Sequence, residues 1–240
     1  LGQVRYWDIL IYNHLREKNI VIPPKKEHEK TDKYEGAYVK DPLVGMHNWV
    51  MSFDLNSLYP HLIMQYNMSP ETLVNSGAEL EKGMVDKLLN GEVKNNTEPC
   101  MTPNGAFFRK DIKGFLPELM EQIYNDRVKY KKLLLQAEQE YEDTKNPVLL
   151  KDISKYNNIQ MAKKISLNSA YGAIGNNWFR YYDLLIATAI TTAGQLSIRW
   201  IEKALNIHLN KILKTENIDY VIASDTDSVY ITFDTLVHKI

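Results

Sequence analysis

The chain has 240 residues, of which 44% are hydrophobic and 25% charged, and its formal net charge at pH 7 is −1. This balance is typical of an ordinary globular protein with a substantial core. The near-neutral net charge argues against a protein that binds nucleic acid over its whole surface, but it permits a local basic groove. No apolar run approaches the length of a membrane span, and the single cysteine, Cys100, excludes an internal disulfide and fits a reducing compartment.

The first part of the chain is predicted to hold a helix, a connector, a strand and a second helix. Residues 6–18 have helical spacing, and the Pro-, Lys- and Glu-rich segment 21–42 predicts a connector that contains a domain boundary. Residues 49–53 predict a short buried strand that ends at Asp54, and residues 61–66 continue as a helix.

The middle of the chain predicts an insertion, a β-hairpin and a helical hairpin. Residues 75–97 are rich in charge and predict a surface insertion, and residues 102–114 predict a β-hairpin that turns at an Asn-Gly pair. Two long helices follow, over 118–143 and 154–174, with prolines near the first helix start and in the loop. A short loop between two helices predicts an antiparallel helical hairpin.

The C-terminal part predicts a third long helix, 184–213, and then a tight hairpin with acidic residues at its tip. In "VIASDTDSVYITF" the β-branched runs 220–222 and 229–233 predict strands around Asp225 and Asp227. Residues two apart on an extended chain share a side, so the two carboxylates are expected to lie close together. The alternatives are a solvated turn, or a Mg²⁺ site completed by a carboxylate from elsewhere.

Asp54 is the candidate for that further carboxylate. It stands at the end of the predicted strand in "SFDLNSLYP", where the chain turns into a helix. The turn 55–58 precedes a helix start, whose free N–H groups could hold an anion such as phosphate. The alternative is a helix cap supplied by Asp54 or Ser57.

The helical hairpin carries candidate cations. Lys164, Asn168 and Tyr171 share one helix face, and Arg127 and Lys131 are also one turn apart. The alternative is a solvated helix surface. The helix end "NSAYGAIGNN" argues against that alternative, because so many poor helix formers predict close approach by another backbone or a ligand.

Three motifs in order identify a family resemblance. "SFDLNSLYP", "KKISLNSAYG" and "SDTDS" resemble the three polymerase motifs of family B DNA polymerases, and "YEGA", "TPNGAFF" and "GFLPEL" match secondary motifs. "WFRYYDLLIATAITTAGQ" looks specifically like the polymerases of T-even-type tailed phages. The resemblance covers nearly the whole chain and implies an α+β fold: a palm, built as an antiparallel sheet backed by helices, with an inserted helical-hairpin fingers subdomain.

The resemblance also implies a division of the chain. Residues 1–33 would form the N-terminal helix and connector, 34–116 the first part of the palm, 117–176 the fingers, and 177–240 the second part of the palm. Leu1 in place of Met indicates a piece of a longer polymerase, expected to be inactive or weak by itself. The phage likeness implies action in the cytoplasm of a bacterial host.

The roles implied at the reacting centre follow residue by residue. Asp54 and Asp227 would bind two Mg²⁺ ions, or Mn²⁺ in their place, with the Leu55 carbonyl as a further ligand and Asp225 in support. Lys164 would bind phosphate and protonate the leaving pyrophosphate.

Further residues would bind nucleotide and DNA. Tyr59 would exclude a 2′-hydroxyl, and the other implied nucleotide contacts are Ser57, Leu58, Arg127, Lys164 and Asn168. The implied DNA contacts are Tyr34, Gly36, Ala37, Tyr171, Gly172 and Thr226. The implied partners are primer–template DNA, deoxynucleoside triphosphates and, through parts outside this sequence, a sliding clamp; no membrane is expected.

Some features depart from the family pattern. Ala223 and Ser224 stand where the family usually has Tyr-Gly, the helical hairpin is shorter than in T-even relatives, and neither an exonuclease pattern nor the thumb is in this sequence. Two alternatives stay open: another palm-type nucleotidyltransferase, such as a reverse transcriptase or a primase-like enzyme, or a non-catalytic DNA-binding relic.

Overall fold

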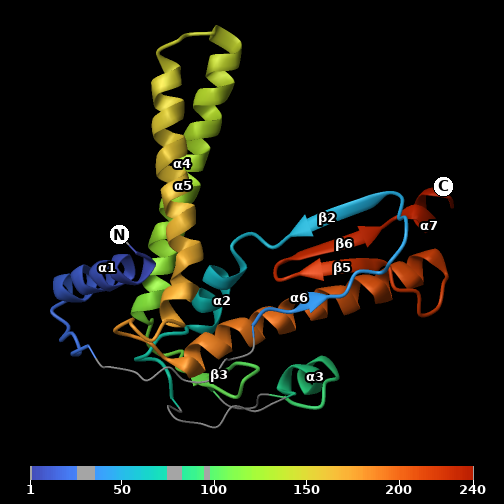
Figure 1. The fold of residues 1–240 in the computed structure, drawn as a ribbon, viewed down its shortest axis with the longest axis horizontal. Helices are drawn as coiled ribbons and strands as arrows, with labels where there is room; N and C mark the ends of the chain where they lie inside the picture. The colour runs from blue at the N-terminus through green and yellow to red at the C-terminus, as the bar shows by residue number, and fades with distance from the viewer. Residues whose placement is uncertain (1, 26–35, 75–82, 95–97, 240) are drawn as a thin grey trace.

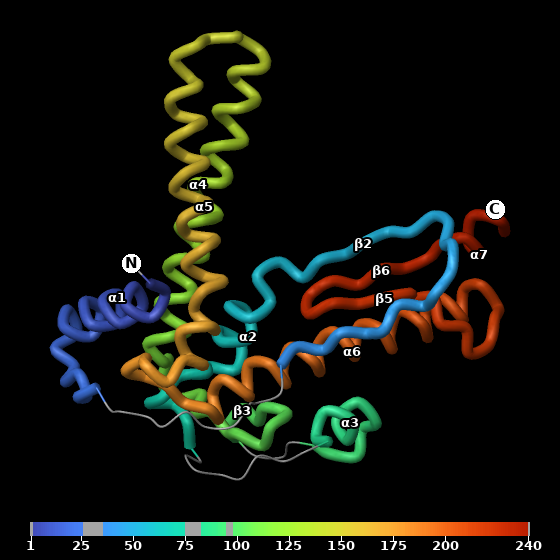
Figure 2. The backbone as a smooth tube through the Cα atoms, viewed as in Figure 1, coloured from blue at the N-terminus to red at the C-terminus, as the bar shows by residue number. Residues whose placement is uncertain are grey.

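A long helix, α6 (Leu184–Leu213), connects a β-sheet to a projecting helical hairpin. The computed structural model describes residues 2–25, 36–74, 83–94 and 98–239. Figure 1 shows the hairpin of α4 (Phe115–Thr144) and α5 (Leu149–Ile174) rising from the body, with the sheet to one side of its base. Figure 2 traces the backbone to the hairpin tip, back down, and along α6 beneath the sheet.

The main sheet has four strands in the order β1-β5-β6-β2, and every neighbouring pair is antiparallel. Its strands are β1 (Val39–Lys40), β2 (Val50–Asp54), β5 (Val221–Asp225) and β6 (Ser228–Thr232). A second, two-stranded sheet pairs β3 (Cys100–Met101) with β4 (Phe107–Phe108). The predicted α+β class, with an antiparallel sheet backed by helices, is confirmed.

The first half of α6 is deeply buried. Every residue from 185 to 195 is buried, and Asp183 caps the helix by accepting bonds from the backbone N–H groups of Leu185 and Ile186 at 2.8 and 3.1 Å. Among the described residues, α6 is the one helix long and apolar enough to cross a membrane, although no apolar run of that length was expected from the sequence. Because 67% of its most apolar window is buried, its apolar side chains are explained by packing inside this protein.

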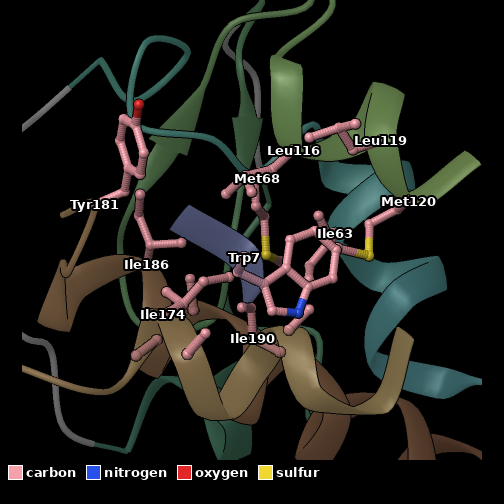
Figure 3. Packing of buried hydrophobic residues seen from close by; sticks show 14 of the residues in the cluster. Trp7, Ile63, Met68, Leu116, Leu119, Met120, Ile174, Tyr181, Ile186 and Ile190 are labelled. Carbon is pink, nitrogen blue, oxygen red and sulfur yellow. The ribbon is translucent and has the colours of Figure 1, made fainter. Parts of the chain in front are cut away.

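Two hydrophobic clusters surround α6. The larger joins α1 (Gln3–Glu17), α2 (Leu58–Tyr66) and the hairpin base to the first half of α6. Figure 3 shows Trp7 of α1 at its centre, against Ile63, Met120 and Ile190. The smaller cluster packs the sheet on the second half of α6, through Ile198, Leu209, Leu213, Tyr220, Val221, Val229 and Ile231.

Most of the predicted elements are present, with shifted ends. The helix predicted over 184–213 has these bounds in the structure, whereas α2 and α5 begin earlier than predicted, at Leu58 and Leu149. The β-hairpin predicted over 102–114 is present and turns at Gly105, whose φ is +81°, but its strands are β3 and β4, so it begins before residue 102 and ends at Phe108. Two short helices were not predicted: α3 (Met84–Leu89), which packs on α6, and α7 (Asp234–Val237).

The prediction that the strand ending at Asp54 is buried is wrong. All residues of β2 are exposed, including Met51 at 53% and Phe53 at 49%. The reason is its position: β2 forms the edge of the sheet, and α6 covers β5 and β6 instead. An apolar sequence therefore indicated a strand correctly but could not indicate its place in the sheet.

Trp7→Ala is expected to lower the free energy of unfolding by about 3–5 kcal/mol, because a fully buried ring leaves a cavity. Trp7 is 1% exposed, and its indole N–H donates to Ser169 Oγ at 3.0 Å, which joins α1 to α5. Denaturant unfolding measures the change. The matched control, Trp200→Ala on α6, removes a ring that is 62% exposed and should change stability little. Equal losses in both variants would contradict this account of the core.

Candidate active site

The pairing of β2 with β6 brings two distant acidic motifs together. Asp54 lies opposite Ser228 in the ladder, and the backbone N–H of Leu55 donates to the carbonyl of Asp227 at 2.8 Å. The carboxylates of Asp54 and Asp227 therefore lie at the same end of neighbouring strands.

The electrostatics of Asp227 reflect this crowding. Burial raises the pKa of its carboxyl group, and the negative charge of Asp54 raises the pKa further, with a smaller contribution from Asp225. Like charges this close are unfavourable unless a cation lies between them.

The tip of the β5–β6 hairpin is a strained turn. Thr226 has φ +55°, a left-handed conformation that is uncommon for a β-branched residue. Its N–H donates to the Tyr38 carbonyl at 3.0 Å, and its hydroxyl donates to the Asp225 carboxylate at 2.9 Å. The Asp225 carboxylate is exposed and accepts the bond from Thr226, whereas the Asp227 carboxylate lies near Asp54.

A cleft of about 500 Å³ opens beside these carboxylates. Its lining comes from β2, the β5–β6 turn, the start of α2 and the facing sides of α4 and α5. The lining residues are Asp54, Asn56, Ser57, Leu58, Tyr59, Pro60, Arg127, Lys164, Asn168, Thr226 and Asp227. One wall therefore carries two carboxylates and the other carries two cations.

Ser57 joins α4 to the start of α2 rather than capping a helix with its side chain. It holds the N-cap position of α2 with φ +54°, but its side chain accepts no bond from the helix backbone, so the interpretation of Ser57 as a side-chain cap is wrong. Arg127 Nη1 donates to Ser57 Oγ at 3.1 Å, and Ser57 Oγ donates to Asn56 Oδ1 at 3.2 Å. Within the described chain, Arg127 Nε is buried without a hydrogen-bond partner.

The structure separates the lysines of the hairpin. Lys163 forms an ion pair with Asp126 across the two helices at 2.9 Å, while its neighbour Lys164 lines the cleft. Lys131, one turn beyond Arg127, is exposed and does not line it.

Tyr59, in α2, lines the cleft, and Tyr171 of α5 packs against its ring without lining the cleft itself. The rings of Tyr59 and Tyr171 are 5.0 Å apart at a 58° tilt. Tyr171, predicted as a DNA contact, therefore touches a lining residue rather than the cleft. Gly172 is exposed on α5, and a side chain built there would meet Gln3 of α1 at 3.2 Å.

The segment predicted to contact template runs beside α6. The carbonyl of Gly36 accepts a bond from Gln195 Nε2 at 2.6 Å, and Arg199 lies over the Tyr38 ring at 5.3 Å. Ala37, between Gly36 and Tyr38, is exposed. Tyr34 lies outside the described residues.

Two lining residues, Asn56 and Pro60, were not assigned a site role from the sequence. Both lie inside the quoted motif "SFDLNSLYP", so the motif itself was the available signal. Across the described ranges, no three His, Cys, Asp or Glu side chains gather as a metal-binding group. The carboxylates that line the cleft are therefore the pair Asp54 and Asp227, and Asp225 accepts a bond from Thr226 instead.

Comparison with known proteins agrees with this arrangement. Residues 2–239 match the family described as DNA polymerase family B. A DNA-directed DNA polymerase of Escherichia phage RB69 is 35% identical over 99% of this chain, and that of Enterobacteria phage T4 is 32% identical over all of it. DNA polymerase 1 of Pyrococcus abyssi is 32% identical over 93% of the chain.

The chain belongs to DNA polymerase family B, and its predicted resemblance to that family is confirmed. The two phage relatives agree with the predicted likeness to T-even-type polymerases. The chain spans 30% and 31% of the length of these two relatives.

Asp227→Asn is expected to raise the melting temperature at pH 7 without divalent cations. The pKa of Asp227 is raised in the folded state, so its contribution to stability is present below the ordinary value of 3.8 and is lost as the pH rises through the raised pKa. The neutral amide avoids this loss, and its advantage should shrink toward pH 3. Thermal unfolding in EDTA across this range measures it.

The matched control is Glu138→Gln on the distal half of α4, an exposed position that should change stability little at any of these pH values. A destabilised Asp227→Asn variant, or an advantage independent of pH, would contradict the proposed repulsion.

Proposed function

We propose that residues 1–240 form the core of a DNA-directed DNA polymerase, which adds deoxynucleotides to a primer 3′-hydroxyl opposite a template. The observation that carries this proposal is the single cleft with a carboxylate pair on one wall and Arg127 and Lys164 on the other. In this proposal, residues 34–116 and 177–240 form the palm. Residues 117–176, which hold all but the start of the α4–α5 hairpin, form the fingers, and residues 1–33 lead into the palm.

The acidic wall fits divalent metal. Asp54 and Asp227 supply carboxylate oxygens, the donors that Mg²⁺ prefers. The pKa of Asp227 is raised first by burial and further by the charge of Asp54, and a cation would relieve the repulsion between the two carboxylates. Mg²⁺ typically uses one or two carboxylates and takes its other ligands from phosphates and water, which agrees with a pair rather than a larger cluster. The Leu55 carbonyl is a further donor, and Asp225 supports the turn. Bound metal, Mg²⁺ or Mn²⁺, would activate the 3′-hydroxyl and stabilise charge on the phosphates.

The basic wall fits a triphosphate. Arg127 is held by Ser57 but keeps a buried Nε without a partner in the described chain, a donor that a phosphate oxygen would satisfy. Lys164 brings a second positive charge, and proton donation from its ammonium to the leaving pyrophosphate would assist bond cleavage. The start of α2 adds the backbone donors of Ser57 and Leu58.

The part of the cleft around Tyr59 fits the sugar and base of an incoming nucleotide. Tyr59 would lie under the sugar, where its ring leaves no room for a 2′-hydroxyl, and Tyr171 supports that ring. Asn168 and Gly172 would contact the new base pair, and Thr226 the primer end. Gly36 and Ala37 would contact template. Two phage relatives favour action in a bacterial cytoplasm, with a sliding clamp reached through parts outside this chain.

Asp54→Asn in the full-length parent polymerase is expected to reduce nucleotide addition at least 1,000-fold (roughly 4 kcal/mol), because it removes charge from the metal-binding wall. Primer extension with Mg²⁺ measures the rate. Asp143→Asn, at the far end of α4, is the matched acidic control and should extend normally. Near-normal turnover by Asp54→Asn would refute the proposed function.

Arg127→Ala and Lys164→Ala are each expected to weaken deoxynucleoside triphosphate binding by about tenfold or more, because charge-assisted bonds to phosphate are strong. Titration of a fluorescent deoxynucleotide into the parent polymerase bound to primer–template measures the dissociation constant. Lys131→Ala removes an exposed lysine from the same helix and serves as the control. A larger effect at Lys131 would place the phosphates on a different helix face.

A further inference from the structure

Gly194, inside the first half of α6, occupies a place where glycine is otherwise unfavourable. Glycine inside a helix costs about 1 kcal/mol relative to alanine. The neighbouring small residues, Ala189 and Ala193, already allow α6 to pack closely, and both are fully buried. A specific contact must therefore explain why this position has no side chain at all.

That contact is the ring of Tyr59. A Cβ atom built on Gly194 would lie 2.8 Å from Tyr59 Cε1 and 3.6 Å from Cδ1, with Leu58 Cδ2 at 3.8 Å. Ordinary carbon contacts begin near 3.4 Å, so an added methyl group would displace the ring or the helix by at least 0.6 Å, the difference between 3.4 and 2.8 Å. The Tyr59 ring thus rests directly on the backbone of α6.

The ring is confined on two sides. The backbone of α6 lies against one side, and the Tyr171 ring of α5 lies 5.0 Å away at a 58° tilt. Tyr59 also lines the cleft, which offers the open direction for movement. A methyl group on Gly194 therefore forces the ring toward the cleft, where the sugar of an incoming nucleotide would lie.

We infer that Gly194 is a positioning residue for sugar selection: the absence of its side chain sets how far the Tyr59 ring reaches into the cleft. This inference rests on the proposed polymerase function and adds to it a residue of α6 that does not line the cleft. The substitution Gly194→Ala moves the Tyr59 ring toward the sugar of the incoming nucleotide. This movement weakens deoxynucleotide binding, and it changes how strongly the enzyme discriminates against ribonucleotides.

The test uses single-nucleotide primer extension by the full-length parent polymerase with a deoxynucleotide and the matching ribonucleotide. Gly194→Ala should raise KM for the deoxynucleotide more than it lowers kcat. It should also change the ratio of the two kcat/KM values at least about fivefold, the lower end of overpacking effects. The decisive measurement is the same substitution in a Tyr59→Ala background, where the added methyl group meets no ring and the ratio should not change further.

The matched control is Gly114→Ala, far from the cleft. A Cβ there would lie 2.5 Å from Ser69 Cβ, so this variant should lose stability without changing sugar discrimination. An unchanged ratio in Gly194→Ala, or a change that persists with Tyr59→Ala, would overturn the role of Gly194. Failure of the unmodified parent to extend primers would instead refute the proposed function.

Discussion

The register between β2 and β6 is the constraint on which the candidate active site depends. It places Asp54 opposite Ser228, beside the acidic turn, while Phe53 pairs with the buried Val229. Because side chains alternate along a strand, a slip of one residue would move Asp54 to the other face of the sheet. The pair of carboxylates therefore exists only in this register.

The packing around α6 fixes the position of one wall of the cleft relative to the other. Its second half supports β5 and β6, and its first half supports α2 and the base of the hairpin that carries Arg127 and Lys164. The bond from Arg127 to Ser57 joins the hairpin to the start of α2. One helix thus connects the acidic wall to the basic wall.

Three unfavourable features lie at the cleft, although positive φ values also occur at other described residues outside glycine. Ser57 and Thr226 both have positive φ values, which cost about 1 kcal/mol or more each outside glycine, and Asp227 is held near like charges. The clusters around α6 offset these costs. A strained, charged cleft on a well-packed support is the arrangement expected where rigid positioning serves binding of an anionic ligand and a cation.

Much of the fold followed from local patterns. The bounds of α6, the acidic hairpin and the helical hairpin were predicted because apolar periodicity and turn residues report local conformation. Burial of β2 was predicted wrongly, and α3 was missed, because both depend on neighbours from elsewhere: β2 on its edge position and α3 on its contact with α6.

The sequence by itself determined the family, since three motifs in order resemble family B polymerases, and it determined which residue types were available for chemistry. Only the tertiary structure decided that Lys163 pairs with Asp126 while Lys164 lines the cleft, and that Gly194 lies against Tyr59. The physical reason is that a motif is local, whereas a contact depends on the packing of helices and strands that the chain brings together from distant positions.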